Sequence, residues 1–433
     1  MSAPSLRVGS SLSWSAQIAD RYRCTLPSDL IKWFDDEVWR QASQSGESPF
    51  FDSPVSPEVL LTASPEPIWP ALMPNDFLPV VGNQMGDWLC LRFGEDSCVR
   101  DIVHWYHGGG DWIPWGTSLS EALLFDAFRE RLPGSGRDHA VPAPSLNQQP
   151  GCSAPSQSKS LLSPTRLQHW ATEQLHEKLT SDPWMLNGSE LTETLMNSRI
   201  SQVAINCQLI IDSLGLSKDA HPSQLETVTG NPQPLRFDQS LPAEETGRAH
   251  INGDQNWERA FQLAQETTMV SSDVAWAWEV IGYANERGNR LEEAFNAYEQ
   301  GLECSSFSDQ SVRLRTHLMT EEGQKFSAAR LILHGMKPRV EAKAAYLDCL
   351  NVTSASERRT RVCEHFTKLA DASGGDGAYG HLHRAGWDLG AEPLSVYGEL
   401  LERLSAAANE SGRHALAALS ETHLACFQSR YGG

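Results

Sequence analysis

The pattern of apolar and polar positions between residues 77 and 116 predicts a small antiparallel sheet. A short apolar run over 77–81 is followed by a segment with Gly and Asn, which suits a chain reversal because these residues accept positive φ at low cost. Segments 88–93 and 102–107 then place successive side chains on alternating faces, the period of a half-buried strand. A polar turn and the glycine turn at 108–111 follow them, and the latter leads into the aromatic segment WIPW. We therefore expect a meander of neighbouring strands.

A helix is expected directly after this meander. Ser118 and Glu121 have the spacing of a capping box, in which the serine accepts from the third amide and the glutamate reaches back. Apolar residues over 124–132 fall on one side of the helix, so this side should lie across the sheet. Together with helical patterns over 14–38, residues 1–132 predict an α+β domain in which helices cover an antiparallel sheet.

Three segments of this region, FLPVVGNQMGDWLCLRF (77–93), HWYHGGGDW (104–112) and TSLSEALLFDAF (117–128), resemble the SUKH superfamily, which contains yeast cell-wall assembly regulators and many bacterial immunity proteins. The segment LPSDLIKWF at 26–34 is similar to the family's first helix, so the resemblance spans the predicted α+β domain. The chain departs from the family at 35–38, where Asp-Asp-Glu-Val replaces the usual Asn-Gly-Gly. The resemblance implies a domain that binds a partner protein, as immunity proteins bind cognate toxins.

Composition divides the rest of the chain into segments. Residues 41–75 are rich in Ser, Pro and Glu and are expected to form a loop around the meander. Residues 133–164 are a Gly, Ser, Pro and Gln mixture with almost nothing to bury, so we expect a disordered linker. Helical patterns return over 165–216, whose packing partner stays open, and Pro, Gly and acidic residues over 217–250 predict a loop or second linker.

The last part of the chain, 251–433, contains an internal repeat. Residues 286–302 align with 321–337 at a period of 35, and Ala260 lies 34 residues before Ala294 in the same half-unit. A helical period of this length is typical of tetratricopeptide repeats. The repeat therefore predicts a region built from stacked helical hairpins.

The unit that begins at Ala275 resembles the tetratricopeptide pattern at its packing positions. Small residues at Gly282 and Ala294 allow two helices to approach, and aromatic side chains such as Tyr298 fill the space beside them. Residues 251–433 are expected to form an all-α tetratricopeptide-like solenoid of roughly three to five helical hairpins. The resemblance implies that inner-face side chains contact a peptide ligand, and in this unit they are Trp276, Glu279, Tyr283 and Glu286.

Composition and charge narrow the class of function. The 433-residue chain is 40% hydrophobic and holds neither the roughly 20 consecutive apolar residues that span a bilayer nor a signal-peptide core, so we expect a cytoplasmic protein without a membrane partner. Its formal charge of -20 argues against a nucleic-acid partner, because phosphate binding needs clustered Lys and Arg. Residues 1–132 carry 18 Asp and Glu against 9 Lys and Arg. This acidity either serves solubility or attracts a basic partner protein.

Side chains able to hold a metal or perform catalysis form no recognisable pattern. Nine cysteines are scattered without CxxC spacing, so neither a zinc site nor a disulfide framework is expected. His104 and His107, three apart on a predicted strand, should point to opposite faces, and His381 and His383 should splay on a helix. The sequence lacks GxSxG, HExxH and P-loop motifs. We expect no catalytic residues, no metal and no cofactor.

The remaining candidate is a recognition surface around the meander. Tryptophan is over-represented at binding hot spots, but a small sheet covered by helices also needs aromatic core, so both roles stay open for each tryptophan. Polar residues at strand ends and turns are expected to be exposed, with plain turn chemistry as the alternative. The candidate protein-binding residues are Asp87, Trp88, Trp105, His107, Asp111, Trp112 and Trp115.

The chain is compatible with three classes of function. The favoured one is a non-catalytic protein that binds a partner protein, such as a toxin or another basic protein, and neutralises or regulates it as immunity proteins do. The alternative is a regulatory scaffold in which the helical repeats bind a ligand peptide and the N-terminal domain is accessory. The third, an enzyme, requires a polar cleft with opposed titratable groups. The sequence makes no prediction of oligomeric state.

Overall fold

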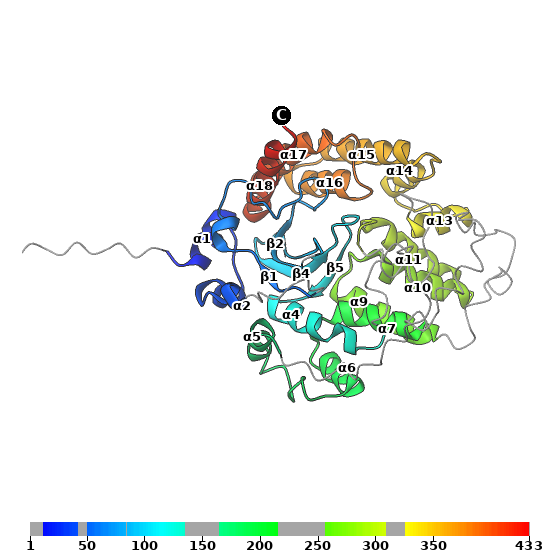
Figure 1. Ribbon diagram of the computed structural model, residues 1–433. Coiled ribbons are helices and arrows are strands. Elements are labelled where there is room, and N and C mark those ends of the chain that lie inside the picture. Colours follow the sequence, from blue (N-terminus) through cyan, green and yellow to red (C-terminus); the bar gives the residue numbers. More distant parts are fainter. Residues whose placement is uncertain are drawn as a thin grey trace, which may run out of the picture.

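The computed structural model describes six stretches of the chain. They are residues 12–41, 50–83, 85–134, 164–214, 256–308 and 325–432. Most of the predicted linker and all of the predicted loop at 217–250 lie outside the described residues. Figure 1 shows a central sheet with helices arranged around it.

Five strands form one antiparallel sheet in the order β1-β2-β3-β4-β5, so each strand pairs with its neighbours in the chain. The predicted meander is therefore confirmed for β2 to β5, and β1 adds a short strand from the segment that was predicted to be a loop. Gly82 lies opposite Trp88, and glycine is needed there because a Cβ atom would lie 2.8 Å from the indole ring. The strands are β1 (Ser53–Pro54), β2 (Phe77–Gly82), β3 (Trp88–Phe93), β4 (Val99–Trp105) and β5 (Trp112–Gly116).

Helix α4 (Leu119–Phe128) follows β5 directly, as predicted. The Ser118 hydroxyl accepts from the Glu121 amide at 3.2 Å. The Glu121 carboxylate, however, accepts from the amide and the hydroxyl of Thr117, both at 2.9 Å, so only half of the expected capping box forms. Nearly every side chain of α4 is buried, because β5 lies on one side and α5 (Arg166–Gln174) on another. The helix is therefore buried on several sides, whereas the sequence predicted one apolar side.

The helical segment 165–216, whose packing partner the sequence left open, is described as far as residue 214 and contacts both parts of the molecule. α5 packs on α4, and Lys178 Nζ lies 2.6 Å from the buried carboxylate of Glu121. α7 (Gln202–Ser213) packs against β5 and also against α9 of the later helices. The other helices that precede those are α1 (Trp14–Tyr22), α2 (Ser28–Asp35), α3 (Pro57–Leu60) and α6 (Gly188–Asn197).

Nine described helices form the last part of the chain, which we call the array. α10 and α11 make the predicted hairpin, in which a Cβ atom on Gly282 would lie only 2.3 Å from the ring of Tyr298. Membership of the tetratricopeptide family stays a prediction. None of the helices that the structure describes is long and apolar enough to cross a bilayer. The array comprises α9 (Trp257–Val270), α10 (Ala275–Arg287), α11 (Leu291–Glu303), α13 (Phe326–Leu333), α14 (Glu341–Leu350), α15 (Ala355–Asp371), α16 (Gly375–Trp387), α17 (Val396–Glu410) and α18 (His414–Tyr431).

The array curves around the sheet (Figure 1). At β5, the Trp112 amide donates to the Phe307 carbonyl at 2.8 Å, so the segment after α11 pairs with the sheet edge. Arg92 on β3 is buried and donates both to Asp101 on β4 and, at 2.6 Å, to Asp273 in the array. At the other end, α18 packs against α1. The sheet and the array therefore share an extended interface.

Candidate protein-interaction surface

Two turns and one loop meet at one end of the sheet. Trp88 opposes both Gly82 and Trp105 in the strand register, so the β2–β3 turn and the β4–β5 turn lie at the same end. Leu72, from the loop before β2, reaches this end as well, since a Cβ atom on Gly110 would lie 3.0 Å from it. We call this region the sheet-end surface and define it by Leu72, Met85, Asp87, His107 and Gly108.

Asp87 links the two turns. Its Oδ1 accepts from the His107 backbone amide at 3.0 Å and from His107 Nδ1 at 2.8 Å. Its Oδ2 lies 3.3 Å from Asn83 Nδ2 and 3.7 Å from His104 Nε2. Burial alone would raise the pKa of this carboxyl group, but the contacts with His104 and His107 outweigh it and hold the pKa of Asp87 well below its usual range. Because the ionised carboxylate accepts, His107 Nδ1 carries the hydrogen, and Nε2 is the nitrogen available to a partner.

The prediction that His104 and His107 point to opposite faces is wrong, because both approach the carboxylate of Asp87. β4 ends at Trp105, so strand alternation does not extend to residue 107. His104 itself is buried and stacks on Tyr106, with ring centroids 3.8 Å apart. Within the described ranges, no group of three or more His, Cys, Asp and Glu side chains could hold a metal ion.

Apolar side chains on the sheet-end surface are exposed. Met85 is 49% exposed, Leu72 is 39% exposed, and the side chain of His107 is 52% exposed. Gly110 has a φ of +78° and lies against Leu72, so the fold requires a glycine there. Gly108 has no positive φ, and a Cβ atom on it would meet no described atom within 4 Å. No contact or backbone angle in the fold therefore requires a glycine at position 108. Because Gly108 has no side chain, another molecule can approach its backbone closely.

The other residues predicted around the meander lie mainly in the core. Trp105, Trp112 and Trp115 are buried, so these three side chains are part of the core and not of a contact surface. Trp88 is half-buried. Asp111 is half-buried too, and its backbone carbonyl accepts a hydrogen bond within the β4–β5 turn at 2.8 Å, which is ordinary turn chemistry. Of the residues predicted around the meander, Asp87 and His107 thus line the sheet-end surface.

The four residues predicted to contact a peptide in the array are not accessible. Trp276, Glu279 and Tyr283 are buried, and the ring of Tyr283 lies against aromatic rings from α9 and α13. Glu286 is paired with Arg330 of α13. These side chains serve the packing of the array, so they do not form the exposed inner face that the repeat resemblance implied.

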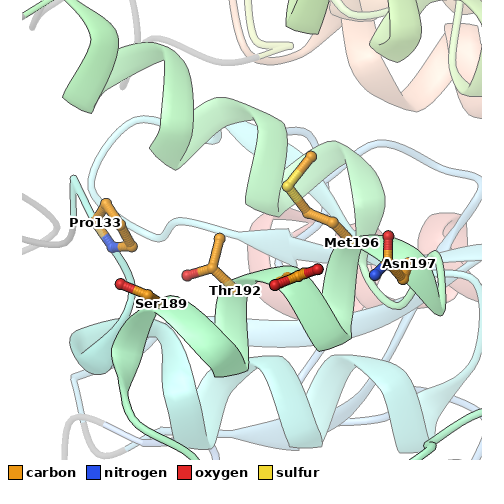
Figure 2. A pocket seen from close by; sticks show the side chains of 6 residues that line it. Pro133, Ser189, Thr192, Met196 and Asn197 are labelled. Atoms are coloured by element: carbon orange, nitrogen blue, oxygen red, sulfur yellow. The ribbon is translucent and has the colours of Figure 1, made fainter.

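A hollow of about 360 Å³ lies beside α6 (Figure 2). Among the described residues of its lining, Glu193 is the single titratable side chain, so these residues offer no opposed pair for acid–base chemistry. It contains none of the residues that the sequence analysis selected. Its lining consists of Pro133, Ser189, Thr192, Glu193, Met196 and Asn197.

No protein-family model, curated protein or solved structure matches the chain. The resemblances to the SUKH superfamily and to tetratricopeptide repeats therefore stay predictions. Sequence reasoning selected Asp87 and His107 but missed Leu72, Met85 and Gly108. Leu72 lies in the loop rich in Ser and Pro, where no periodicity marks it, whereas the run of three glycines was the available signal for Gly108.

Proposed function

We propose that this chain is a non-catalytic protein that binds a partner protein through the sheet-end surface and neutralises or regulates it, as an immunity-type protein does. The observation that supports this best is the combination of two exposed apolar side chains, Leu72 and Met85, with an imidazole that Asp87 holds in place. The buried centre of a protein interface is apolar, with Met among the enriched residues, and a polar rim surrounds it. A side chain that is already oriented loses little entropy on binding.

The charge of the chain favours a basic partner. The formal net charge is -20, and the first 132 residues contribute 18 acidic against 9 basic side chains. In its neutral form, His107 presents the lone pair of Nε2, because Nδ1 donates to Asp87. That acceptor suits an N–H group of Lys or Arg, and negative charge also accelerates the encounter with a basic protein. A basic toxin belongs to this class of partner.

The alternative function, a scaffold whose repeats bind a ligand peptide on the predicted inner face, has less support. It places the ligand on α10, where Trp276 and Glu279 are buried. It also needs an accessible inner face, whereas the array packs around the sheet through contacts such as that between Arg92 and Asp273. We therefore favour the sheet-end surface over the array as the partner site.

The test compares four versions of the full chain immobilised on a support and exposed to a native lysate of the source cells. Leu72→Asp and Met85→Asp place a charge at exposed positions and should leave folding intact. Each should weaken retention of the main partner about tenfold or more, since loss of a hot-spot contact costs upward of about 1 to 2 kcal/mol. Met185→Asp is the matched control, because Met185 is 75% exposed and lies outside the sheet-end surface. It should retain the partner as the unmodified chain does.

Two results would contradict the proposal at different levels. Equal retention of the same partner by all four chains would exclude the sheet-end surface as the site. If the unmodified chain retains no protein while its circular dichroism shows a folded molecule, the binding function itself is refuted.

A further inference from the structure

The loop that joins α3 to β2 lies against the last helices of the array. We call residues 65–77, which end at the first residue of β2, the resident segment. Trp387 Nε1 on α16 donates to the Ala71 carbonyl at 3.0 Å. His423 on α18 is buried, and its Nε2 lies 3.0 Å from the Phe77 carbonyl, to which it donates. Two helices thus contact the main chain of the resident segment at separate points.

α18 also contacts the start of the resident segment. Cys426 Sγ lies 3.6 Å from the Pro65 carbonyl, and Arg430 donates to the Glu66 carbonyl. The guanidinium of Arg430 additionally lies over the ring of Trp69, 5.4 Å from its centroid. Main-chain carbonyls from the first to the last residue of the segment are therefore recognised by side chains of the array.

Side chains of the resident segment are recognised as well. Asn75 is fully buried and donates through Nδ2 to the hydroxyls of Tyr379 at 3.1 Å and Ser420 at 2.8 Å. Asp76 Oδ1 lies 3.2 Å from His383 Nε2. An Asn-Asp pair is thus held between α16 and α18. Buried polar groups with fixed partners are the feature that gives a binding site its specificity.

The recognising side chains come from one stripe on each helix. They are four residues apart on α16 and three or four apart on α18, the spacing that places side chains on a single helix face. The rings of the α16 stripe also follow one another, with centroids 6.4 and 5.4 Å apart. The stripes consist of Tyr379, His383 and Trp387 on α16, and of Ser420, His423, Cys426 and Arg430 on α18.

The resident segment has the character of a preorganised peptide. It contains four prolines, which fix φ and so reduce the entropy lost on ordering. Ala71 has a φ of 75°, a conformation that alanine rarely adopts, and it is the residue whose carbonyl accepts from Trp387. Backbone carbonyls and one Asn-Asp pair make the polar contacts with the two stripes, and Ile68, Met73 and Phe77 of the segment are buried in the core. A separate peptide of this sequence carries the same groups.

We infer that the α16–α18 stripes form a recognition site for a proline-rich turn peptide, and that residues 65–77 occupy this site as a ligand supplied by the same chain. A peptide of the same chemistry enters when the resident segment detaches, because the two compete for the same donors. The two stripes share no residue with the sheet-end surface, although Leu72 of the resident segment belongs to that surface. The test of the site needs no partner protein.

The experiment uses the full chain and a fluorescent synthetic peptide of residues 64–78, with binding followed by fluorescence anisotropy. Asn75→Ala weakens the attachment of the resident segment to the array, because it removes two buried hydrogen bonds, and it leaves both stripes unchanged. The peptide should bind this variant about ten- to hundredfold more tightly than the unmodified chain, because a larger fraction of the sites is open. Asp76→Asn, which is isosteric and weakens the pair with His383, is the second variant should the first fail to fold.

Two controls make the result specific. In the Asn75→Ala chain, Trp387→Phe keeps an aromatic ring but removes the donor to the Ala71 carbonyl, so peptide affinity should fall about fivefold or more. A scrambled peptide that keeps the four prolines should bind at least tenfold less tightly than the native sequence. The inference is overturned if the scrambled peptide binds equally well. It is also overturned if neither folded variant binds the native peptide better than the unmodified chain does.

Discussion

The same substitution at two helical glycines should change stability in opposite directions. Gly282 lies within α10 and Gly380 within α16, both away from the helix ends. Alanine in place of a helix-interior glycine stabilises by about 1 kcal/mol, because the unfolded alanine has less backbone freedom to lose. A Cβ atom on residue 380 would meet no described atom within 4 Å, so Gly380→Ala should show the full gain.

Gly282→Ala should instead destabilise the protein. The new Cβ atom would lie 2.3 Å from a carbon of the Tyr298 ring, and that ring is fully buried. The ring cannot move away easily, since its hydroxyl donates to Glu286 at 2.7 Å and Phe326 lies beside it with ring centroids 6.0 Å apart. Overpacking costs about 1 to 3 kcal/mol, and an approach this far inside van der Waals contact belongs at the upper end. After the gain from alanine's higher helix propensity is subtracted, we expect the free energy of unfolding to fall by about 1 to 2 kcal/mol.

Urea unfolding followed by tryptophan fluorescence measures both effects under one set of conditions. Gly380→Ala should raise the midpoint and Gly282→Ala should lower it, with free energies of unfolding about 2 to 3 kcal/mol apart. A second substitution, Tyr298→Leu, should reduce the penalty of Gly282→Ala by removing the ring. If Gly282→Ala is as stable as Gly380→Ala, α10 and α11 do not approach as closely as the structure shows.

Two further predictions concern buried ionisable groups. Burial lowers the pKa of His423 from 6.5 to about 4. The stability that the neutral imidazole contributes should therefore be fully present above about pH 6.5, and the free energy of unfolding should decrease by about 3 kcal/mol as the pH falls toward 4. His423→Gln should lack this part of the pH profile in urea unfolding, and an identical profile would contradict the reasoning. Lys325 and Asp388 form a buried pair at 2.7 Å, and Arg384 lies 3.6 Å from the same carboxylate, so Lys325→Met should cost about 3 kcal/mol by removing the nearer of its two cations. Adding Asp388→Asn should recover much of that loss, and an equal loss in the single and double variants would count against the explanation.

Local signals were sufficient to predict the meander and α4, because strand alternation and the Ser118 cap act over a few residues. They failed at His107, where the two-residue period was extended beyond the end of the strand. The packing of the array around the sheet was not predictable. Its contacts, such as that of the Trp112 amide with the Phe307 carbonyl, join distant residues through main-chain atoms that every residue carries. The sheet-end surface was only partly predictable for the same reason, since Leu72 joins it from a loop without periodicity.

The array and the sheet-end surface are physically connected through the resident segment. Leu72 follows Ala71, whose carbonyl accepts from Trp387, and the Leu72 side chain lies against the turn at Gly110. An array contact at one residue thus fixes the exposed position of the next. Chains in which the segment is weakened, such as Asn75→Ala, should therefore lose orientation at Leu72 and retain less of the partner protein. On this argument the array contributes to binding without touching the partner, because it orders one of the two apolar anchors that the partner contacts.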